Sequence, residues 1–405
     1  MSLLSVLTAA LVAVPAVAPP AAPPLALPQR QGVDTVAEWY DTTVATIAAA
    51  PAATQVTNSR TWAISWLAAA RALRRRPAPP AFRDAALASA VHRSLVALVP
   101  ARKTELDAAL ATALARIPEG ASKRRGIAAG VREADALLRE REGDGLDPAS
   151  VNRAYTPQPA APGVWQPTPP TFSPGAQAGT RLARPFLLSR ADQYRPAPPP
   201  ALDSERYRKD LEEVRVYGAL NSTARTQAQT DTAQFWYGSS LTLYDGVLGA
   251  AVRQSADKPQ AWRAGLVAIF HVALVDTQIA TSDAKYAYVL WRPVTALRVT
   301  DPEWTPLHNT PAHPDYPSGH NTYSGAAEKV LTALVGYRAK RPYTITSPTQ
   351  PGATRTYTDW KKPTEENVNA RVWSGIHTRS ADETGVRLGG DVAAHALRDA
   401  VRLFR

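Results

Sequence analysis

The chain of 405 residues contains no cysteine, and its single methionine is Met1. Without cysteine there can be no disulfide, iron–sulfur cluster, thiolate zinc site or cysteine nucleophile. The sequence also lacks a Walker or dinucleotide-type glycine-rich loop, an HExxH motif and a GxSxG motif. These absences exclude the commonest nucleotide-binding, metalloprotease and serine-hydrolase classes.

Charge is missing from the N-terminus, where no charged side chain precedes Arg30. Residues 3–14 form an apolar run that is too short to cross a bilayer of about 30 Å but fits the apolar region of a secretory signal. Ala16-Val17-Ala18 has the small residues of a cleavage site. We expect residues 1–30 to be a signal or disordered segment and the protein to be secreted or extracytoplasmic. Without export it would be cytoplasmic, and integral membrane association is not expected.

Positive charge predominates elsewhere, with 46 Lys and Arg against 35 Asp and Glu and a formal net charge of +11. This balance favours an anionic partner, which could be nucleic acid, phosphate or another oxyanion. The basic residues are scattered and no recognised nucleic-acid-binding module appears, so a nucleic-acid partner is not expected.

Three regions follow the N-terminal segment. Residues 31–150 show apolar side chains at three- and four-residue spacing, which predicts helices. Residues 151–203 form a proline-rich connector that cannot be regular helix, and its aromatic residues predict that it is pinned to the body: Trp165, Phe172, Phe186 and Tyr194. Residues 204–405 form a second helical region, with helical patterning to about 296 and a short hairpin predicted from 343–346 and 354–358.

The first segment that could bind a ligand runs from Lys285 to Arg292 and Pro293. On a continuous helix, seven residues turn through about 700°, so both cations would emerge from nearly the same face. Such a face can hold one anion between an ammonium and a guanidinium group.

Two further segments carry histidines. In His313-Pro-Asp-Tyr-Pro-Ser-Gly-His320, Pro317 and Gly319 predict a tight loop in which Ser318 and the Gly319 N–H can bind an oxyanion. His320 then stands ready as an acid or base. In the third segment, Arg371 and His377 are six residues apart, so they converge only if the chain bends, and Gly375 is the expected place.

Together these segments resemble the signature KxxxxxxRP, PSGH and SRxxxxxHxxxD of the superfamily of type 2 phosphatidic acid phosphatases and vanadium-dependent haloperoxidases. The resemblance implies an all-α fold of paired helical bundles, like that of vanadium chloroperoxidase. It also implies vanadate, or phosphate in the same site, as the bound oxyanion. The implied oxyanion ligands are Lys285, Arg292, Ser318, Gly319 and Arg371. His320 would be the acid or base, and His377 would bond to vanadium or attack phosphorus.

The sequence departs from this signature at two positions, where Ala370 replaces the serine and Ala381 replaces the aspartate. In the family that aspartate helps to orient the histidine, so here Asp382, Ser380 or a backbone carbonyl would have to take its place.

Halide preference is implied by a further position. His313 stands seven residues before His320, where bromide-oxidising members commonly have histidine and chloride-oxidising members an aromatic residue. The resemblance therefore implies bromide or iodide as the halide. Trp291 and Asp382 are assigned with His313 to the halide pocket and the surroundings of the site.

Three functions remain open. The first is a vanadate-dependent haloperoxidase that uses hydrogen peroxide and a halide to make hypohalous acid, which halogenates a small organic acceptor, with Lys285 polarising a peroxide oxygen. The second is an acid phosphatase with a phosphohistidine intermediate. The third is a non-catalytic anion-binding relative. A homo-oligomer is possible in each case.

Overall fold

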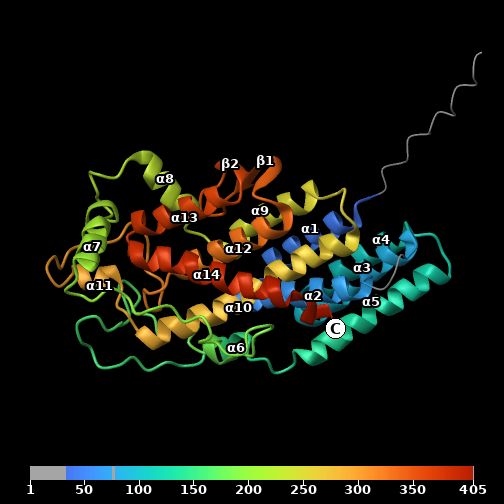
Figure 1. Ribbon diagram of the computed structural model, residues 1–405, viewed down its shortest axis with the longest axis horizontal. Coiled ribbons are helices and arrows are strands. Elements are labelled where there is room, and N and C mark those ends of the chain that lie inside the picture. The colour runs from blue at the N-terminus through green and yellow to red at the C-terminus, as the bar shows by residue number, and fades with distance from the viewer. Residues whose placement is uncertain (1–32, 75–77, 405) are drawn as a thin grey trace, which may run out of the picture. The chain divides into compact units, whose positions relative to one another are not determined.

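A computed structural model describes residues 33–74 and 78–404 (Figure 1). The predicted signal and its cleavage site lie outside these residues. Within the described part, residues from Asp34 onward form one unit. The prediction of an all-α fold is confirmed, because helices dominate and the one described sheet has only two strands.

The N-terminal region forms helices between 35 and 140, as predicted. They are α1 (Thr35–Ala49), α2 (Gln55–Leu73), α3 (Pro80–Leu98), a 3-10 turn η1 (Pro100–Arg102), α4 (Lys103–Ala115) and α5 (Ala121–Glu140). Asp34 caps α1 by accepting the backbone N–H groups of Val36 and Ala37, and Pro80 begins α3 at a position where its missing N–H costs nothing.

The connector contains only α6 (Pro148–Val151) and the 3-10 turn η2 (Thr180–Leu182). It is tied to the body by Asp276, whose carboxylate accepts the backbone N–H groups of residues 186, 187 and 188. The prediction that its aromatics pin it holds for Trp165, which is 1% exposed, but not for Phe172, which is 63% exposed. Phe172 has a positive φ of 48°, which points to a turn there.

The C-terminal region holds the remaining elements. They are α7 (Glu205–Tyr217), α8 (Gln227–Phe235), α9 (Ser240–Gln254), α10 (Gln260–Tyr288), α11 (Pro293–Leu297), α12 (Gly319–Val335), β1 (Arg338–Thr346), β2 (Thr354–Asp359), α13 (Lys361–Trp373), α14 (Arg379–Asp399) and a 3-10 turn η3 (Ala400–Phe404). The predicted hairpin is β1 paired antiparallel with β2.

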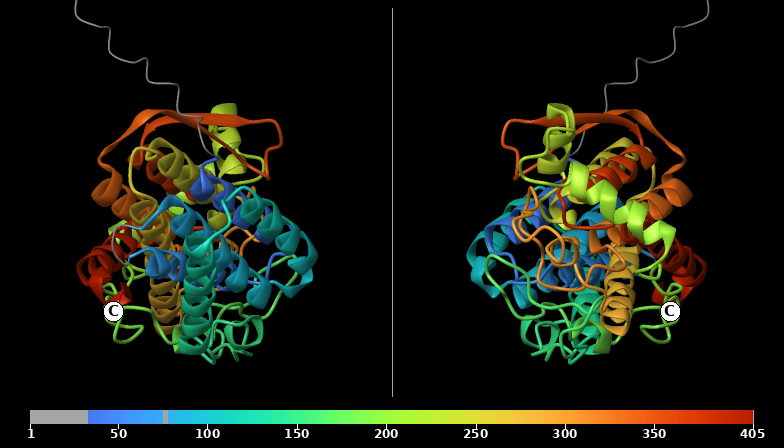
Figure 2. Two further views of the ribbon diagram at one scale, coloured as in Figure 1. Left: turned by 90° about the vertical axis from the view of Figure 1, so that its right-hand side faces the viewer. Right: turned by 90° about the vertical axis from the view of Figure 1, so that its left-hand side faces the viewer.

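Helix α10 is the central element. It packs against α2 on one side and against α12 and α14 on another. In Figure 1 the helices α1–α5 gather near one end of α10, and α7 and α11 lie near the other; Figure 2 views the unit from these two ends. Among the described residues α10 alone is long and apolar enough to span a bilayer, but 94% of its apolar window is buried inside the protein. This burial is typical of a core helix.

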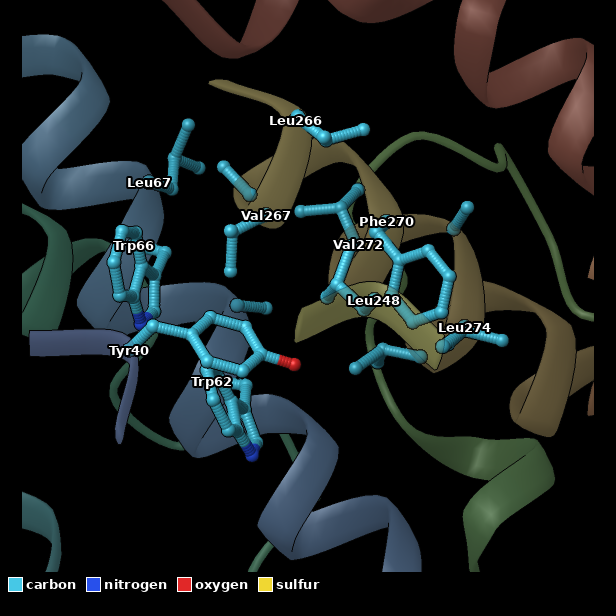
Figure 3. Close-up of a cluster of buried hydrophobic side chains, with 14 of the residues drawn as sticks. Tyr40, Trp62, Trp66, Leu67, Leu248, Leu266, Val267, Phe270, Val272 and Leu274 are labelled. Carbon is cyan, nitrogen blue, oxygen red and sulfur yellow. The ribbon is translucent and has the colours of Figure 1, made fainter. Parts of the chain in front are cut away.

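The main core joins both helical regions (Figure 3). Tyr40 from α1 and Trp62 from α2 lie with their rings 5.0 Å apart, and Trp62 stacks on His271 of α10 at 4.6 Å. Leu248 of α9 and Phe270 of α10 are fully buried in the same cluster. Each such side chain contributes about 1.5–3 kcal/mol through burial. Residues 31–150 and 204–405 therefore share one hydrophobic core.

Helices α12 and α14 approach each other closely because glycine faces the contact. A Cβ on Gly389 would lie 2.0 Å from the carbonyl oxygen of Thr322, and one on Gly385 would lie 2.7 Å from that of Ser318. Neither position can hold a larger residue without a shift of backbone. This approach brings the start of α14 beside the start of α12, where the candidate site lies.

Candidate oxyanion-binding active site

Lys285 and Arg292 do not share one helix, contrary to the sequence-based prediction. Helix α10 ends at Tyr288, and Val289 turns the chain with a left-handed φ of 44°. Arg292 is the N-cap of α11 with an extended ψ of 155°, because Pro293 disfavours helical geometry in the residue before it. The two cations still converge, but they do so because the chain turns after the end of α10 and not because both lie on one face of a continuous helix.

Lys285 is buried at the end of α10. Its Nζ donates to the carbonyl oxygens of Pro314 at 2.6 Å and Asp315 at 3.1 Å. Burial lowers the pKa of Lys285 well below its usual value, and the neighbouring Arg292 lowers it further. An anion placed beside it would raise this pKa again, because an opposite charge favours the ammonium form.

Arg292 and Arg371 are 0% and 1% exposed. Burial lowers the pKa of each to about 10. Arg292 donates to the carbonyl oxygens of His313 and Ile376, both at 2.6 Å. Arg371 donates to that of Trp236 at 3.1 Å, while its Nε has no partner among the described residues. Three buried cations at one place favour an anion with more than one charge.

The PSGH loop starts α12. Ser318 is its N-cap, and its backbone N–H donates to the carbonyl oxygen of Ala381 at 2.9 Å. The Ser318 Oγ is buried, makes no hydrogen bond of ordinary geometry within the described part of the chain, and lies near the carboxyl group of Asp382, whose pKa burial raises and this hydroxyl lowers. Gly319 is the first helical residue, so its N–H has no acceptor within the helix. A Cβ there would lie 3.8 Å from Cε of Lys285, which places this N–H next to the ammonium stem.

His320 follows on α12, and its Nε2 lies 2.9 Å from the carbonyl oxygen of Gly238. The carbonyl can only accept, so Nε2 carries the proton and Nδ1 bears the lone pair. Burial lowers the pKa of His320 well below its usual value, and Arg371 adds to this, so the ring is neutral. A neutral ring can accept a proton at Nδ1.

His377 lies in the turn between α13 and α14, and the chain bends at Gly375 as the sequence predicts. Gly375 has a φ of +78°, and a Cβ there would lie 2.4 Å from the carbonyl oxygen of Gly218. The bend brings Nε2 of His377 to 3.2 Å from Nη1 of Arg292. Burial, and then Arg292, lowers the pKa of His377 well below its usual value.

The partner of His377 was missed in the sequence. Its Nδ1 lies 2.6 Å from Oδ1 of Asp315, which comes from the loop before α12. The expectation that Asp382 or Ser380 takes this place is wrong. Asp382 accepts from Asn321 at 2.7 Å, and Ser380 accepts from Arg206 at 2.8 Å.

A signal for Asp315 does exist in the sequence. It is a carboxylate inside the compact loop that also carries Ser318 and His320, and a charged residue there has to be paired if it is buried. The sequence does not show which of the distant segments supplies that pair.

His313 and Trp291 were both expected in the halide pocket, but the structure places only His313 at the cavity. His313 lines the cavity, and its Nδ1 accepts from Nη2 of Arg292 at 2.9 Å. Trp291 does not line it; its Nε1 donates to the hydroxyl of Tyr207. The indole therefore packs on α7 and does not face the oxyanion residues.

A cavity of about 110 Å³ lies next to the oxyanion residues. Lys285 and three histidines line it, together with uncharged polar side chains from α2, the connector, α10 and α12. Arg292, Arg371 and Ser318 are not among its lining residues. The lining includes Gln55, Gln177, Gln278, Thr281, Ser282, Lys285, His313, Gly319, His320, Thr322 and His377. Gln55 shows that the N-terminal region contributes to the site, which the motifs alone do not reveal.

A tetrahedral oxyanion such as vanadate or phosphate fits the residues present. The buried Ser318 Oγ and Arg371 Nε are unpartnered donors within the described chain, and leaving such groups unpaired is costly. Lys285, Arg292 and the Gly319 N–H add further donors, and Nε2 of His377 adds a nucleophilic nitrogen. The donor set is therefore chemically suited to an oxyanion with three or four oxygens.

Comparison with known proteins relates the chain to vanadium haloperoxidases. Residues 297–405 match the VCPO second helical-bundle domain. The structure is similar to that of a bacterial vanadium-dependent iodoperoxidase, with a TM-score of 0.75 and 25% identity over 90% of this chain and 94% of that one. Residues 297–405 thus carry a vanadium haloperoxidase domain, and the chain as a whole shares the fold of the vanadium haloperoxidases.

Two further relatives are similar to this chain. Vanadium chloroperoxidase of Curvularia inaequalis is 26% identical over 228 residues, which are 40% of this chain and 37% of that protein. The match thus spans little more than a third of that relative's length. An apo-type bacterial vanadium-dependent chloroperoxidase has a TM-score of 0.72 at 16% identity, covering 88% of this chain and 96% of that chain, and shows the shared fold.

Proposed function

We propose that this protein is a vanadate-dependent haloperoxidase that uses hydrogen peroxide to oxidise bromide or iodide to hypohalous acid. The observation that carries the proposal is the position of Nε2 of His377, which faces buried Arg292 while Asp315 holds its Nδ1. Support also comes from the chain-wide likeness to an iodoperoxidase, which includes the N-terminal helices.

Vanadate would bind to Nε2 of His377, with its oxygens held by Lys285, Arg292, Arg371, Ser318 and the Gly319 N–H. When bound, it supplies a Lewis acid that polarises a coordinated oxygen without changing its own oxidation state. The residues of the site keep this centre charged and dry, because all three cations are buried.

The protein's own acid–base groups manage the protons. Neutral His320 can take a proton from hydrogen peroxide at Nδ1 as the peroxide binds. The Lys285 side chain lies close to Gly319, and its ammonium group would polarise a peroxide oxygen. In the overall reaction, halide, hydrogen peroxide and one proton give hypohalous acid and water, so the proton stored on His320 can be returned to the leaving oxygen.

His313 supports bromide or iodide over chloride. It lines the cavity, and since its Nδ1 accepts from Arg292, its proton sits on Nε2. A small organic acceptor would take up the halogen. We also propose that the predicted N-terminal signal exports the protein, so that hypohalous acid forms outside the cytoplasm.

A phosphatase reaction uses the same residues. Nε2 of His377 would attack phosphorus, and His320 would protonate the leaving group. The hydrogen bond from His377 to Asp315 favours this chemistry equally, because it keeps the proton on Nδ1 and the lone pair on Nε2. The likeness of the N-terminal helices to an iodoperoxidase favours the haloperoxidase.

One experiment separates these functions. Protein freed of bound oxyanion is assayed for bromination of an activated 1,3-diketone with peroxide and bromide, and for hydrolysis of p-nitrophenyl phosphate, each with and without orthovanadate. We expect orthovanadate to switch on bromination, and His377→Ala to abolish it. Hydrolysis that orthovanadate inhibits would make the protein a phosphatase. Absence of both activities would indicate that the protein is a non-catalytic, anion-binding relative.

A further inference from the structure

The superfamily signature places an aspartate four residues after the last histidine, and here that position is Ala381. His377 nevertheless has a carboxylate partner, because Oδ1 of Asp315 lies 2.6 Å from its Nδ1. We propose that Asp315 replaces the missing aspartate and is the positioning residue that holds Nε2 of His377 toward the oxyanion. The proposal rests on the oxyanion site of the proposed function.

The Asp315 carboxylate is itself held from several sides. Its backbone N–H donates to the carbonyl oxygen of Leu290 at 2.9 Å, which fixes the loop. Its Oδ2 accepts the hydroxyl of Thr378 at 2.8 Å and, more weakly, the Thr378 backbone N–H at 3.4 Å. With Oδ2 occupied, Oδ1 is left for the imidazole, so the orientation of the ring is determined by the protein.

The charge on Asp315 determines which nitrogen of His377 carries the proton. Its Oδ2 accepts from the hydroxyl and the N–H of Thr378, and Nη1 of Arg292 lies 3.9 Å from its Oδ1, so its surroundings favour the carboxylate form. An ionised carboxylate only accepts hydrogen bonds. Nδ1 of His377 must therefore donate, and Nε2 carries the lone pair that a bond to vanadium or phosphorus requires.

The environment of Ala381 explains why one carboxylate suffices. Ala381 is fully buried in a small apolar cluster with Leu290 and Tyr316. An aspartate there would place a further carboxylate next to the residue that follows Asp315, in a dry environment that already holds Asp382. Burial, with a contribution from Asp315, raises the pKa of Asp382 to about 8. Another buried carboxylate would add to this repulsion, which favours Asp315 as the carboxylate that holds His377.

Nitrogen NMR of the full-length protein labelled with 15N-histidine tests the proposal. The His377→Gln variant assigns the ring signals. We expect Nδ1 of His377 to be protonated in the native protein. In Asp315→Asn the amide oxygen should stay with the Thr378 N–H and the amide nitrogen should face His377, which moves the proton to Nε2. Asp315→Ala should remove the preference for Nδ1.

Binding of orthovanadate, measured by calorimetry without peroxide or halide, gives the second readout. We expect both Asp315 variants to bind about 10- to 100-fold more weakly than the native protein. Asp276→Asn is the control, because Asp276 is a buried carboxylate that holds the connector. It should lower the unfolding temperature but leave the His377 signals and orthovanadate binding unchanged.

The proposal is overturned if both Asp315 variants keep the proton on Nδ1 and bind orthovanadate as the native protein does. Because neither readout requires halide oxidation, the proposed function can fail separately. A protein that makes no hypohalous acid but shows the tautomer change would retain Asp315 as the positioning residue. If the native protein bound no orthovanadate, the oxyanion site would be refuted, and the NMR arm would decide the role of Asp315 alone.

Discussion

Nη2 of Arg292 donates to Nδ1 of His313 across 2.9 Å, so a buried cation and a neutral histidine share one hydrogen bond at the wall of the cavity. Burial lowers the pKa of His313 well below its usual value, and the nearby cations Lys285 and Arg292 lower it further. The histidine therefore stays neutral and presents its remaining N–H from Nε2. In the proposed function, this hydrogen bond would connect oxyanion binding with halide selection.

Replacing His313 by phenylalanine should change halide preference. Phenylalanine can neither accept from Arg292 nor donate an N–H, and a lost hydrogen bond to a charged group costs about 1.5–3 kcal/mol. We expect kcat/KM for bromide to fall at least about tenfold, with a smaller change for chloride. Steady-state rates of orthovanadate-loaded protein give this ratio. His395→Phe, on α14 outside the cavity lining, is the control, and an unchanged ratio in His313→Phe would remove His313 from halide selection.

His271 should make the fold less stable in acid. It is fully buried, both ring nitrogens are unpartnered among the described residues, and burial lowers its pKa well below the usual 6.5. Below about pH 6.5 His271 binds a proton in the unfolded chain but stays neutral in the folded protein. The free energy of unfolding therefore falls by up to about 1.4 kcal/mol per pH unit as the pH decreases.

The variant His271→Phe keeps the ring stacked on Trp62 and removes this proton. The free energy of unfolding, measured in urea, should fall less for the variant than for the native protein when the pH is lowered from 7.5 to 5.0. The difference should reach up to about 2 kcal/mol. Parallel pH dependences of the two proteins would show that His271 is protonated equally in both states.

A methyl group added at Gly389 should disrupt the contact between α12 and α14. Its Cβ would lie 2.0 Å from the Thr322 carbonyl oxygen, whereas a Cβ on the neighbouring Gly390 would meet nothing within 4 Å. Gly389→Ala should lower the free energy of unfolding by about 1–3 kcal/mol and weaken orthovanadate binding, because Ser318 starts α12. Gly390→Ala should raise stability by up to about 1 kcal/mol. Equal effects of the two substitutions in urea would contradict the close approach.

The fragment 204–405 should not fold by itself. It would carry every sequence-predicted site residue, but it would lose Tyr40, Trp62 and Trp66, which cover α9 and α10 in the shared core. We expect the fragment to bind a hydrophobic dye and to lack a cooperative thermal transition. A fragment that unfolds cooperatively and binds orthovanadate would make the two helical regions independent domains.

Much of the site could be predicted because its residues lie in short motifs. Within PSGH or from Arg371 to His377, spacing along the chain limits how far apart the groups can be. The helices were likewise predictable from apolar periodicity, because that period reflects one buried face. The path from Lys285 to Arg292 was not, since Pro293 could equally have kinked a continuous helix.

Contacts between distant segments could not be read from spacing. Asp315 and His377 are 62 positions apart, and they meet because glycines let α14 lie against α12. Gln55 reaches the cavity from α2, more than two hundred positions before the motifs, because α2 packs on α10. Trp291 stands beside Arg292, but neighbours in an extended segment point to opposite sides, so the indole lies away from the cavity.

A crystal structure of the protein with orthovanadate tests the central claim most directly. We expect vanadium bonded to Nε2 of His377, its oxygens within hydrogen-bonding distance of Lys285, Arg292, Arg371, Ser318 and the Gly319 N–H, and Asp315 still on Nδ1. Orthovanadate bound elsewhere, or a His377 ring turned so that Nε2 faces away from these cations, would contradict the account.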